Sequence, residues 1–301
     1  MKVPEIKLWS SDLGQGGELT REFLIADVFT GAPLEGNQLG IFPDGRGLSA
    51  ELMQQAAREM NYSETVFFLP PDNPGKADAH VRIFTPGKEL PFAGHPTLGS
   101  AWVLGDLLGK DTVTLQLGVG LVPVVLERDA GSGEIIFGRM SQPVPGVAAY
   151  ERVPELLAAL GLQPYGLPVE VYDNGPLHVY AEVPSVAALA AVAPDMQALA
   201  RLEVGVGVFT EADGHWAYRN FVPHAGVPED PATGSAAGPL AVHLARHGRI
   251  AFGEEIEIRQ GAQVKRPSVL CARADGSAEG VERVLVGGRS VLVARGEYRL
   301  G

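Results

Sequence analysis

The sequence predicts an α+β protein of two similar domains, and three observations support that fold class. Short runs rich in β-branched and aromatic residues, typical of strands, alternate with a few apolar helical patterns along the 301 residues. Each half follows the same order: strands, a helix, more strands, a Pro/Gly turn and an apolar second helix. The two Pro/Gly turns also align with each other when the second half is placed on the first so that Pro231 falls on Pro91. The matching pairs are Pro91 and Pro231, Gly94 and Gly234, Ala101 and Ala241, and Leu104 and Leu244.

The elements of the first half follow from periodicity and capping. Ser49 is a suitable N-cap for a helix over residues 49–61, whose apolar residues share one face. A second, more apolar helix begins after Gly94 and ends at Gly109. Strands are expected over 22–29, 37–42, 63–71, 79–86, 111–118 and 121–128, the last two as an antiparallel pair.

The second half repeats this order. Helices are expected over 151–162 and 185–202, the latter broken at Pro194, and the turn at 229–234 opens a third helix that ends at Gly248. Strands are expected over 168–175, 177–184, 204–211, 217–223, 254–261, 268–274, 282–288 and 290–300.

The domain boundary is expected in the proline-containing segment 140–155. We expect an irregular N-terminal extension over residues 1–20, an N-terminal domain over 21–143 and a C-terminal domain over 144–288. The last strand, residues 289–301, is expected to complete the N-terminal domain.

The composition excludes several kinds of partner and site. Lys and Arg number 24 against 36 Asp and Glu, a net charge of −12, so we expect no nucleic-acid or membrane partner. The single cysteine, Cys271, excludes an intramolecular disulfide, and its apolar strand predicts a buried, inert thiol. No apolar segment resembles a secretory signal or reaches a membrane-spanning length, so we expect a cytoplasmic protein.

Glu64 stands at the entry to a very apolar strand, in the stretch NYSETVFF. Such a carboxylate is either a solvent-facing strand end or a general base. Neighbours such as Phe67 and Phe68 would partly desolvate it and make its protonated form accessible, as proton exchange near neutral pH requires. The local sequence alone favours the structural role.

His95 lies between Gly94 and Pro96 at the expected start of an apolar helix. Helix N-termini expose backbone N–H groups and favour anions, and Pro96 suits the first turn because its missing N–H is not needed there. His95 is therefore a proton carrier, an anion contact or a polar cap, and the local sequence leaves all three open.

Asp230 precedes Pro231 in EDPATGSAAG, which is a common arrangement for a turn before a helix. Behind it, Gly234, Ser235 and Ala236 bring small side chains and free N–H groups to the helix start. That arrangement suits a carboxylate or a developing oxyanion. A phosphate loop is not expected, because no lysine follows and the glycine spacing differs.

His243 and His247 lie four residues apart in HLARH, a spacing that can bind zinc. The glutamate of the metalloprotease pattern is replaced by Leu244, and the helix dipole explains a histidine in the last turn. We therefore expect no metal site.

Four motifs together resemble the phenazine-biosynthesis PhzF family, and they follow that family's order. They are DVFTGAPLEGNQLGIF, NYSETVFF, FTPGKELPFAGHPTLGSAWVLG and EDPATGSAAGPLAVHL. The resemblance covers the chain from Phe23 onward and implies a diaminopimelate-epimerase-like fold. In that fold, each domain is a mixed β-sheet wrapped around a central helix, and the active site lies in the cleft between the domains. Gln38, where family members often have proline, and the order of residues in TPGKELPF are departures that could alter substrate fit.

The resemblance also assigns roles to residues. The glutamate of the SET motif is the family's proton shuttle and matches Glu64. The histidine of the GHPT motif matches His95 and the aspartate of the DPATGSA motif matches Asp230; both would bind and polarise the substrate. Gly94, Gly234, Ser235 and Ala236 would belong to the substrate-binding turns.

A two-thiol mechanism, as in the epimerase relatives, is not expected, since Gly94 and Gly234 stand in the matching turns and Cys271 lies elsewhere. One glutamate can both remove and return a proton, so no metal or organic cofactor is required. The resemblance also implies a homodimer.

We therefore expect a cofactor-independent isomerase or epimerase that moves a proton on a small cyclic or amino carboxylate. In the PhzF type the substrate is dihydro-hydroxyanthranilate. The alternative is a non-catalytic protein that binds a small metabolite on the same fold. A nicotinamide-dependent oxidoreductase is not expected, because the sequence has no dinucleotide phosphate loop.

Overall fold

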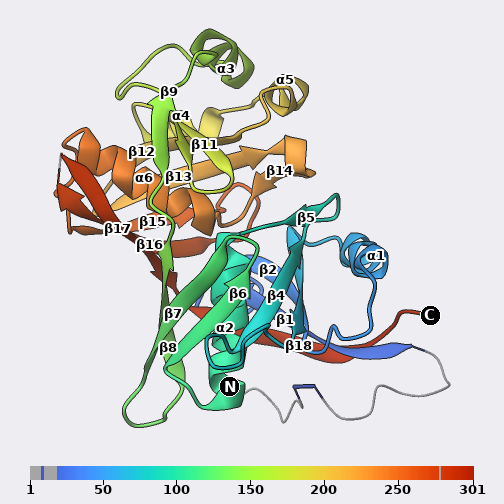
Figure 1. Ribbon diagram of the computed structural model, residues 1–301. Coiled ribbons are helices and arrows are strands. Elements are labelled where there is room, and N and C mark those ends of the chain that lie inside the picture. Colours follow the sequence, from blue (N-terminus) through green and yellow to red (C-terminus); the bar gives the residue numbers. More distant parts are fainter. Residues whose placement is uncertain (1–7, 10–18, 278) are drawn as a thin grey trace. The chain divides into compact units, whose positions relative to one another are not determined.

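The computed structural model describes residues 8–9, 19–277 and 279–301, which divide into two compact units (Figure 1). The first unit comprises the described residues up to Met140 together with Gly288–Gly301, and the second comprises Ser141–Gly287. Most of the expected irregular extension over residues 1–20 lies outside the described residues, and Thr20 already begins a strand.

Among the described residues of the first unit, two helices accompany the strands, α1 (Ala50–Met60) and α2 (Gly94–Leu108). The strands are β1 (Thr20–Val28), β2 (Asn37–Phe42), β3 (Glu64–Leu69), β4 (Ala79–Phe84), β5 (Glu89–Leu90), β6 (Thr112–Leu117), β7 (Gly120–Arg128), β8 (Ile135–Gln142) and β18 (Ser290–Arg299).

The second unit contains four α-helices and a short 3-10 helix among its described residues: α3 (Val153–Leu160), α4 (Val186–Ala191), α5 (Met196–Ala200), α6 (Gly234–Arg246) and η1 (Pro223–Ala225). Its strands are β9 (Gly146–Ala149), β10 (Glu170–Asp173), β11 (Leu177–Glu182), β12 (Gly205–Ala212), β13 (His215–Val222), β14 (Val227–Asp230), β15 (Glu255–Gln260), β16 (Ser268–Ser277) and β17 (Gly280–Gly288).

The two units share one sheet plan. Neighbouring strands in the first unit follow the order β18, β1, β2, β3, β4, β6, β7, β8. In the second unit the order is β9, β10, β11, β12, β13, β15, β16, β17. The pairs β2–β3 and β4–β6 are parallel, as are the corresponding pairs β11–β12 and β13–β15, and the other pairs in both series are antiparallel. The prediction of two similar domains with mixed sheets is therefore confirmed.

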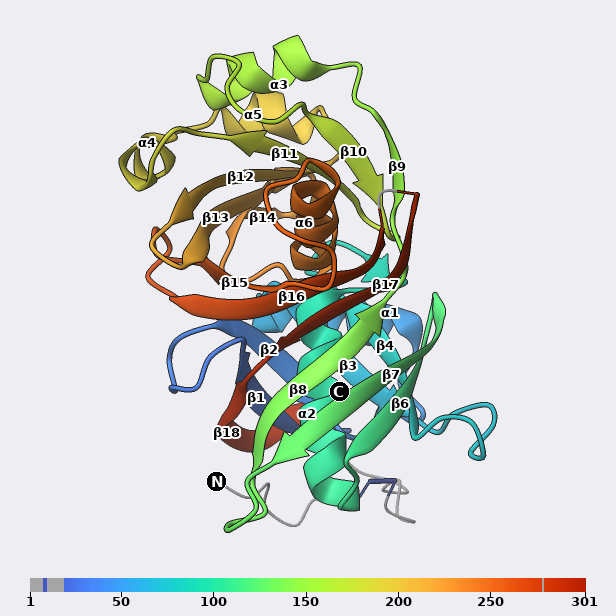
Figure 2. The same ribbon diagram turned by 90° about the vertical axis from the view of Figure 1, so that its left-hand side faces the viewer.

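Each unit packs its strands around one buried helix, as Figure 2 shows for α2 and α6. Both helices are apolar on nearly all sides, which is typical of a helix enclosed in a core. Gly99 permits close packing in α2, since a Cβ there would lie only 2.6 Å from the Leu39 side chain. The predicted equivalence of the two turns also holds in the structure: Gly94 is the first residue of α2 and Gly234 the first residue of α6.

Local signals predicted several element ends correctly. The Ser49 side chain accepts a hydrogen bond from the N–H of Leu52 and caps α1, as expected. The expected break at Pro194 separates α4 from α5. The buried face of α1 packs on an aromatic core in which the rings of Phe42 and Phe67 stack with centroids 4.8 Å apart.

Other local expectations were wrong or incomplete. The segment 140–155, in which the domain boundary is expected, contains the end of β8, all of β9 and the start of α3, and no strand was expected over β9. β9 forms because it pairs with β10, a long-range contact that has no local signal. Cys271 is half-buried rather than fully buried, because it lies on the less enclosed face of β16.

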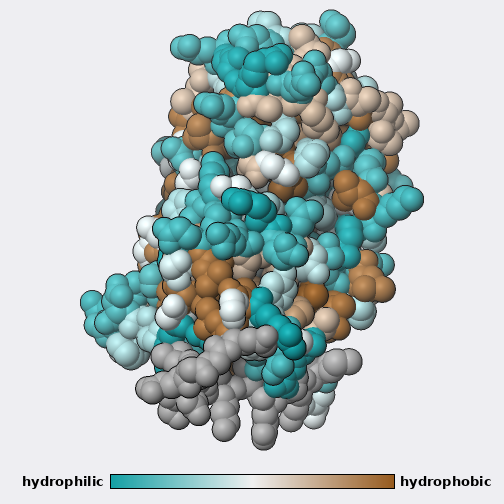
Figure 3. Space-filling model, turned by 90° about the vertical axis from the view of Figure 1, so that its right-hand side faces the viewer, coloured by the Kyte–Doolittle hydropathy of each residue, from teal (hydrophilic) through white to brown (hydrophobic). Residues whose placement is uncertain are grey.

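Hydrophilic residues are interspersed with apolar ones on the face shown in Figure 3. Among the described residues, no helix combines the length and apolar character needed to cross a membrane.

Candidate active site

Glu64 is the first residue of β3, where it pairs in parallel register with Leu39 of β2. The following residues, Thr65–Phe68, are fully buried, so the Glu64 carboxylate lies at the edge of the core. Its side chain keeps 15% of its surface exposed. The Glu64 side chain is thus mostly buried but still partly accessible. This partial exposure suits a general base, which must be able to reach the proton that it removes.

His95 is the second residue of α2, and its side chain contacts the sheet rather than its own turn. Nδ1 lies 3.3 Å from Oε2 of Glu64, and Nε2 lies 3.2 Å from the carbonyl oxygen of Gln38. The N-cap of α2, Ala93, has no side-chain hydrogen bond. Of the three roles that the sequence left open for His95, the polar cap is therefore not the one adopted.

The protonation of His95 follows from these partners. The pKa of His95 falls to about 3 because burial penalises the charged ring, and the hydrogen bond to Gln38 offsets this only in part. The ring is therefore neutral near pH 7. A carbonyl oxygen can only accept, so Nε2 carries the proton and donates to Gln38, which leaves a lone pair on Nδ1 facing Glu64. The Glu64–His95 contact is then favourable when Glu64 is protonated.

The departure at Gln38 does not disturb this contact. Its backbone oxygen, not its side chain, meets His95, and a proline at that position would present the same carbonyl group.

In the second unit, Asp230 ends β14 and is 7% exposed. Its Oδ2 accepts a hydrogen bond of 2.6 Å from the hydroxyl of Thr233, and its backbone oxygen accepts one from Nε2 of Gln260. Oε1 of Gln260 in turn accepts the N–H of Thr233. Gln260 therefore fixes the turn before α6 from a strand that follows the helix, and no local motif pointed to it.

Gly234, Ser235 and Ala236 form the buried first turn of α6. The N-cap Thr233 uses its hydroxyl on Asp230 and makes no side-chain cap, and its carbonyl oxygen accepts the N–H of Ala236. The N–H groups of Gly234 and Ser235 are therefore the ones directed past the helix end. Three side chains donate hydrogen bonds to the carbonyl groups of this turn, and sequence reasoning missed all three. They are Gln142, Asn174 and Tyr180.

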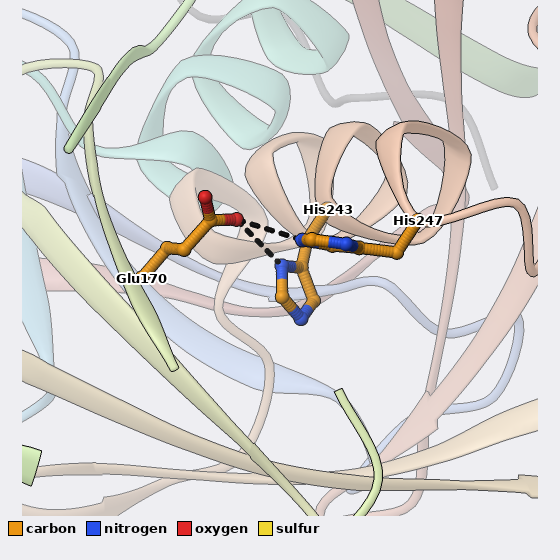
Figure 4. A group of neighbouring side chains, drawn as sticks. All are labelled: Glu170, His243 and His247. Atoms are coloured by element: carbon orange, nitrogen blue, oxygen red, sulfur yellow. Dashed lines mark hydrogen bonds and ion pairs between the residues drawn. The ribbon is translucent and has the colours of Figure 1, made fainter. Parts of the chain in front are cut away.

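His243 and His247 meet Glu170 of β10, and the candidate ligand atoms lie within 4.8 Å of one another (Figure 4). Oε2 of Glu170 accepts hydrogen bonds from Nε2 of His247 at 2.8 Å, from Nη1 of Arg246 at 2.9 Å and from the hydroxyl of Tyr172 at 2.9 Å. Although burial alone would raise the pKa of Glu170, hydrogen bonds from His247 and Tyr172 and the Arg246 charge hold it below its ordinary value.

In this cluster, hydrogen bonds from Arg246 and His247 to Glu170 link the end of α6 to β10. Arg246 already supplies the positive charge that the Glu170 carboxylate needs. Nδ1 of His243 lies 2.9 Å from the hydroxyl of Tyr172, and its Nε2 has no hydrogen-bond partner among the described residues. A metal-bound Nδ1 would require a proton on that partnerless Nε2, contrary to the usual second-shell arrangement. The absence of a metal stays a prediction.

The structure thus groups the candidate residues in two sets, each within one unit. Glu64, His95 and Gly94 belong to the first unit, and Asp230 and the 234–236 turn belong to the second. That the two turns face one another across a cleft stays a prediction.

Comparison with known proteins places the chain in a family. The family model described as phenazine biosynthesis-like protein, PhzC-PhzF, matches residues 26–296. The chain is 49% identical over 275 residues to the trans-2,3-dihydro-3-hydroxyanthranilate isomerase of Pseudomonas chlororaphis, a match that covers 91% of this chain and 98% of the relative.

Solved structures agree. A PhzF-family phenazine biosynthesis protein of Bacillus anthracis superposes with a TM-score of 0.81 at 26% identity, covering 93% of this chain and 99% of the other. A predicted epimerase of Pseudomonas aeruginosa superposes with a TM-score of 0.78 at 35% identity, covering 92% and 99%. The relatives give no support to the alternative of a non-catalytic binding protein. The chain therefore belongs to the PhzF family, and its enzyme class is that of an isomerase.

Proposed function

We propose that this isomerase acts on trans-2,3-dihydro-3-hydroxyanthranilate or a closely similar cyclic amino carboxylate, with Glu64 as the single proton carrier. The observation that carries the proposal is the contact between Glu64 and the unprotonated Nδ1 of His95 at 3.3 Å. The substrate class comes from the relative at 49% identity, whose name specifies that compound.

The geometry suggests how one carboxylate performs both proton transfers. Glu64 removes a proton from a ring carbon, so that a C–H bond breaks, an O–H bond forms and the electron pair enters the conjugated system of the substrate. The new carboxyl proton can hydrogen-bond to Nδ1 of His95, which stabilises this state. Glu64 then returns the proton to a different ring carbon, and the double bonds shift accordingly. No net proton or electron is gained or lost.

The second unit would bind the polar groups of the substrate. The α6 N-terminus offers the N–H groups of Gly234 and Ser235 and the Ser235 hydroxyl to a carboxylate, while Ala236 keeps the turn small. The helix dipole favours an anion there. Asp230, held in place by Thr233 and Gln260, would accept a hydrogen bond from the substrate's amino or hydroxyl group. Gly94 would serve as the corresponding turn residue at the start of α2.

Proton exchange followed by NMR in D2O tests this proposal. With trans-2,3-dihydro-3-hydroxyanthranilate and the wild-type chain, we expect deuterium to enter the product at a ring carbon, because the proton held on the partly exposed Glu64 exchanges with D2O before it is returned. Glu64→Gln should fold normally and reduce the rate by about 10²- to 10⁴-fold, the range of a general acid–base group. Glu59→Gln, which changes an exposed carboxylate on α1, is the matched control. Full activity of Glu64→Gln would remove Glu64 from the mechanism.

We further propose that the working protein is a cytoplasmic homodimer that uses no metal or organic cofactor and binds neither nucleic acid nor membrane. The homodimer rests on the family resemblance and the lack of a cofactor on the single-glutamate chemistry. The cytoplasmic location rests on the lack of an apolar segment of membrane-spanning length in the sequence, and the last two statements rest on the acidic composition. Light scattering during size-exclusion chromatography tests the dimer; a mass of one chain across micromolar concentrations would refute it.

A further inference from the structure

Two buried amide side chains hold the peptide groups on either side of Ser235. Nε2 of Gln142 donates to the carbonyl oxygen of Gly234 at 2.8 Å, and Nδ2 of Asn174 donates to that of Ser235 at 2.9 Å. A carbonyl and the next N–H belong to one rigid plane. Gln142 therefore orients the peptide that carries the N–H of Ser235, and Asn174 orients the peptide that follows. Together they fix the backbone of Ser235 and hence the direction of its side chain.

Pro239 makes the Asn174 contact necessary. In an α-helix, the carbonyl of each residue accepts the N–H of the residue four positions later. For Ser235 that residue is Pro239, which lies inside α6 and has no N–H. The proline ring also clashes with the carbonyl four residues earlier and tilts it away from the helix axis. Asn174 supplies a donor to this carbonyl from outside the helix.

Gly234 differs in this respect. Four positions later stands Gly238, which does have an N–H, so the Gly234 carbonyl retains its regular helical donor in addition to Gln142. The two amides therefore make similar contacts, but only Asn174 replaces a hydrogen bond that the helix cannot make.

Asn174 is itself firmly placed for this contact. It follows the end of β10, is 3% exposed, and precedes Gly175, whose φ of +116° turns the chain into β11. The Oδ1 atom of Asn174 finds no hydrogen-bond partner in the described part of the chain. A buried amide oxygen without a partner costs free energy, so stability alone does not account for an asparagine here.

We propose that Asn174 is a positioning residue for Ser235: it replaces the helical hydrogen bond that Pro239 removes and thereby holds the α6 N-terminus in the geometry that binds the substrate. This inference rests on the proposed function, because substrate binding by Ser235 is part of that function.

The test compares Asn174→Ala, Pro239→Ala and the double variant in steady-state kinetics with trans-2,3-dihydro-3-hydroxyanthranilate. In Asn174→Ala the Ser235 carbonyl loses its donor, and KM should rise about tenfold or more while kcat changes much less. Pro239→Ala adds an N–H at the required position, so the double variant should recover most of the wild-type KM. A purely structural role for Asn174 would instead lower the active fraction and leave KM unchanged.

Gln142→Ala provides the matched control, since it removes the same kind of contact from a carbonyl that keeps its helical donor. Its KM should change less, and Pro239→Ala should not rescue it. The proposal is overturned if Asn174→Ala keeps the wild-type KM, or if the double variant is as impaired as Asn174→Ala alone.

Hydrogen–deuterium exchange separates this inference from the proposed function. Independent of any substrate, exchange of the amides of residues 236–238 and 240 should accelerate in Asn174→Ala and slow again in the double variant. If the wild-type chain does not convert the substrate but exchange follows this pattern, the substrate assignment fails and the Asn174 contact stands. If conversion is normal and exchange in Asn174→Ala equals that of the wild type, the positioning role fails alone.

Discussion

Nδ1 of His95 faces Oε2 of Glu64 at 3.3 Å, while the opposite ring nitrogen donates to a backbone carbonyl. The second contact fixes the proton on Nε2 and leaves Nδ1 as an acceptor. Because burial keeps the ring neutral, the histidine stabilises the protonated form of Glu64 without competing with it for a proton.

His95 should support catalysis without titrating in the working range. His95→Gln retains a donor that can reach Gln38 but removes the acceptor facing Glu64, so the rate should fall by about 10- to 100-fold. Since the pKa of His95 is about 3, the shape of the pH–rate profile between about pH 5 and 8 should be the same in wild type and variant. An acidic limb that is present in the wild type and lost in His95→Gln would contradict this assignment.

Asp230 should act mainly on substrate affinity. Asp230→Asn keeps the size of the side chain and removes its charge, and we expect KM to rise by about 10- to 100-fold, as for the loss of a charge-assisted hydrogen bond. Thr233→Val is the control, because it removes the neighbouring hydroxyl donor and leaves the carboxylate in place. Equal losses in the two variants would show that Asp230 serves mainly to hold the turn.

His178 should make stability depend on pH. Both of its ring nitrogens lack partners among the described residues, and burial, with a smaller contribution from His224, lowers its pKa from 6.5 to about 3. Between these two pKa values the unfolded chain binds more protons than the folded chain. The stability that depends on the neutral ring is therefore complete above pH 6.5 and is lost as the pH falls toward 3. The loss in unfolding free energy is about 1.4 kcal/mol per pH unit.

His178→Leu removes this proton uptake. Urea titrations between about pH 6 and 4 should show a pH slope of the unfolding free energy that is smaller by about one proton than in the wild type. An unchanged slope would mean that the histidine is protonated in the folded state.

Glu170 should matter for stability and not for proton transfer. Glu170→Ala removes the acceptor that Tyr172, Arg246 and His247 share, and leaves Arg246 only its contact with the Tyr172 hydroxyl. We expect a loss of about 2–3 kcal/mol in unfolding free energy. Glu170→Gln retains an acceptor oxygen and should lose less. The deuterium-exchange rate of the substrate should stay within about twofold of wild type in both variants. A large rate loss with normal stability would point to a functional role for the cluster.

Chelation should have no effect on activity. Since Arg246 already neutralises Glu170, we expect dialysis against EDTA to leave the exchange rate and the melting temperature unchanged. A loss that zinc restores in the wild type, but not in His247→Ala, would instead identify Glu170, His243 and His247 as a metal site.

The family, the order of most elements and the identity of the acid–base candidate follow from the sequence alone. These features depend on local chemistry: the Ser49 cap, the glycines at the starts of α2 and α6, and the apolar strand behind Glu64 are all visible in short stretches. The duplication was also visible, because both copies retain the Pro/Gly turn before an apolar helix.

The contacts that hold the candidate side chains in place depend instead on long-range packing. His95 meets a carbonyl 57 positions away, and the carbonyls beside Ser235 receive donors from Asn174, 61 positions from Ser235, and Gln142, 92 positions from Gly234. Such contacts arise when sheet pairing brings distant segments together, and asparagine or glutamine in a sequence gives no sign of which carbonyl it will reach. For the same reason, β9 had no local signal, since it becomes a strand only by pairing with β10.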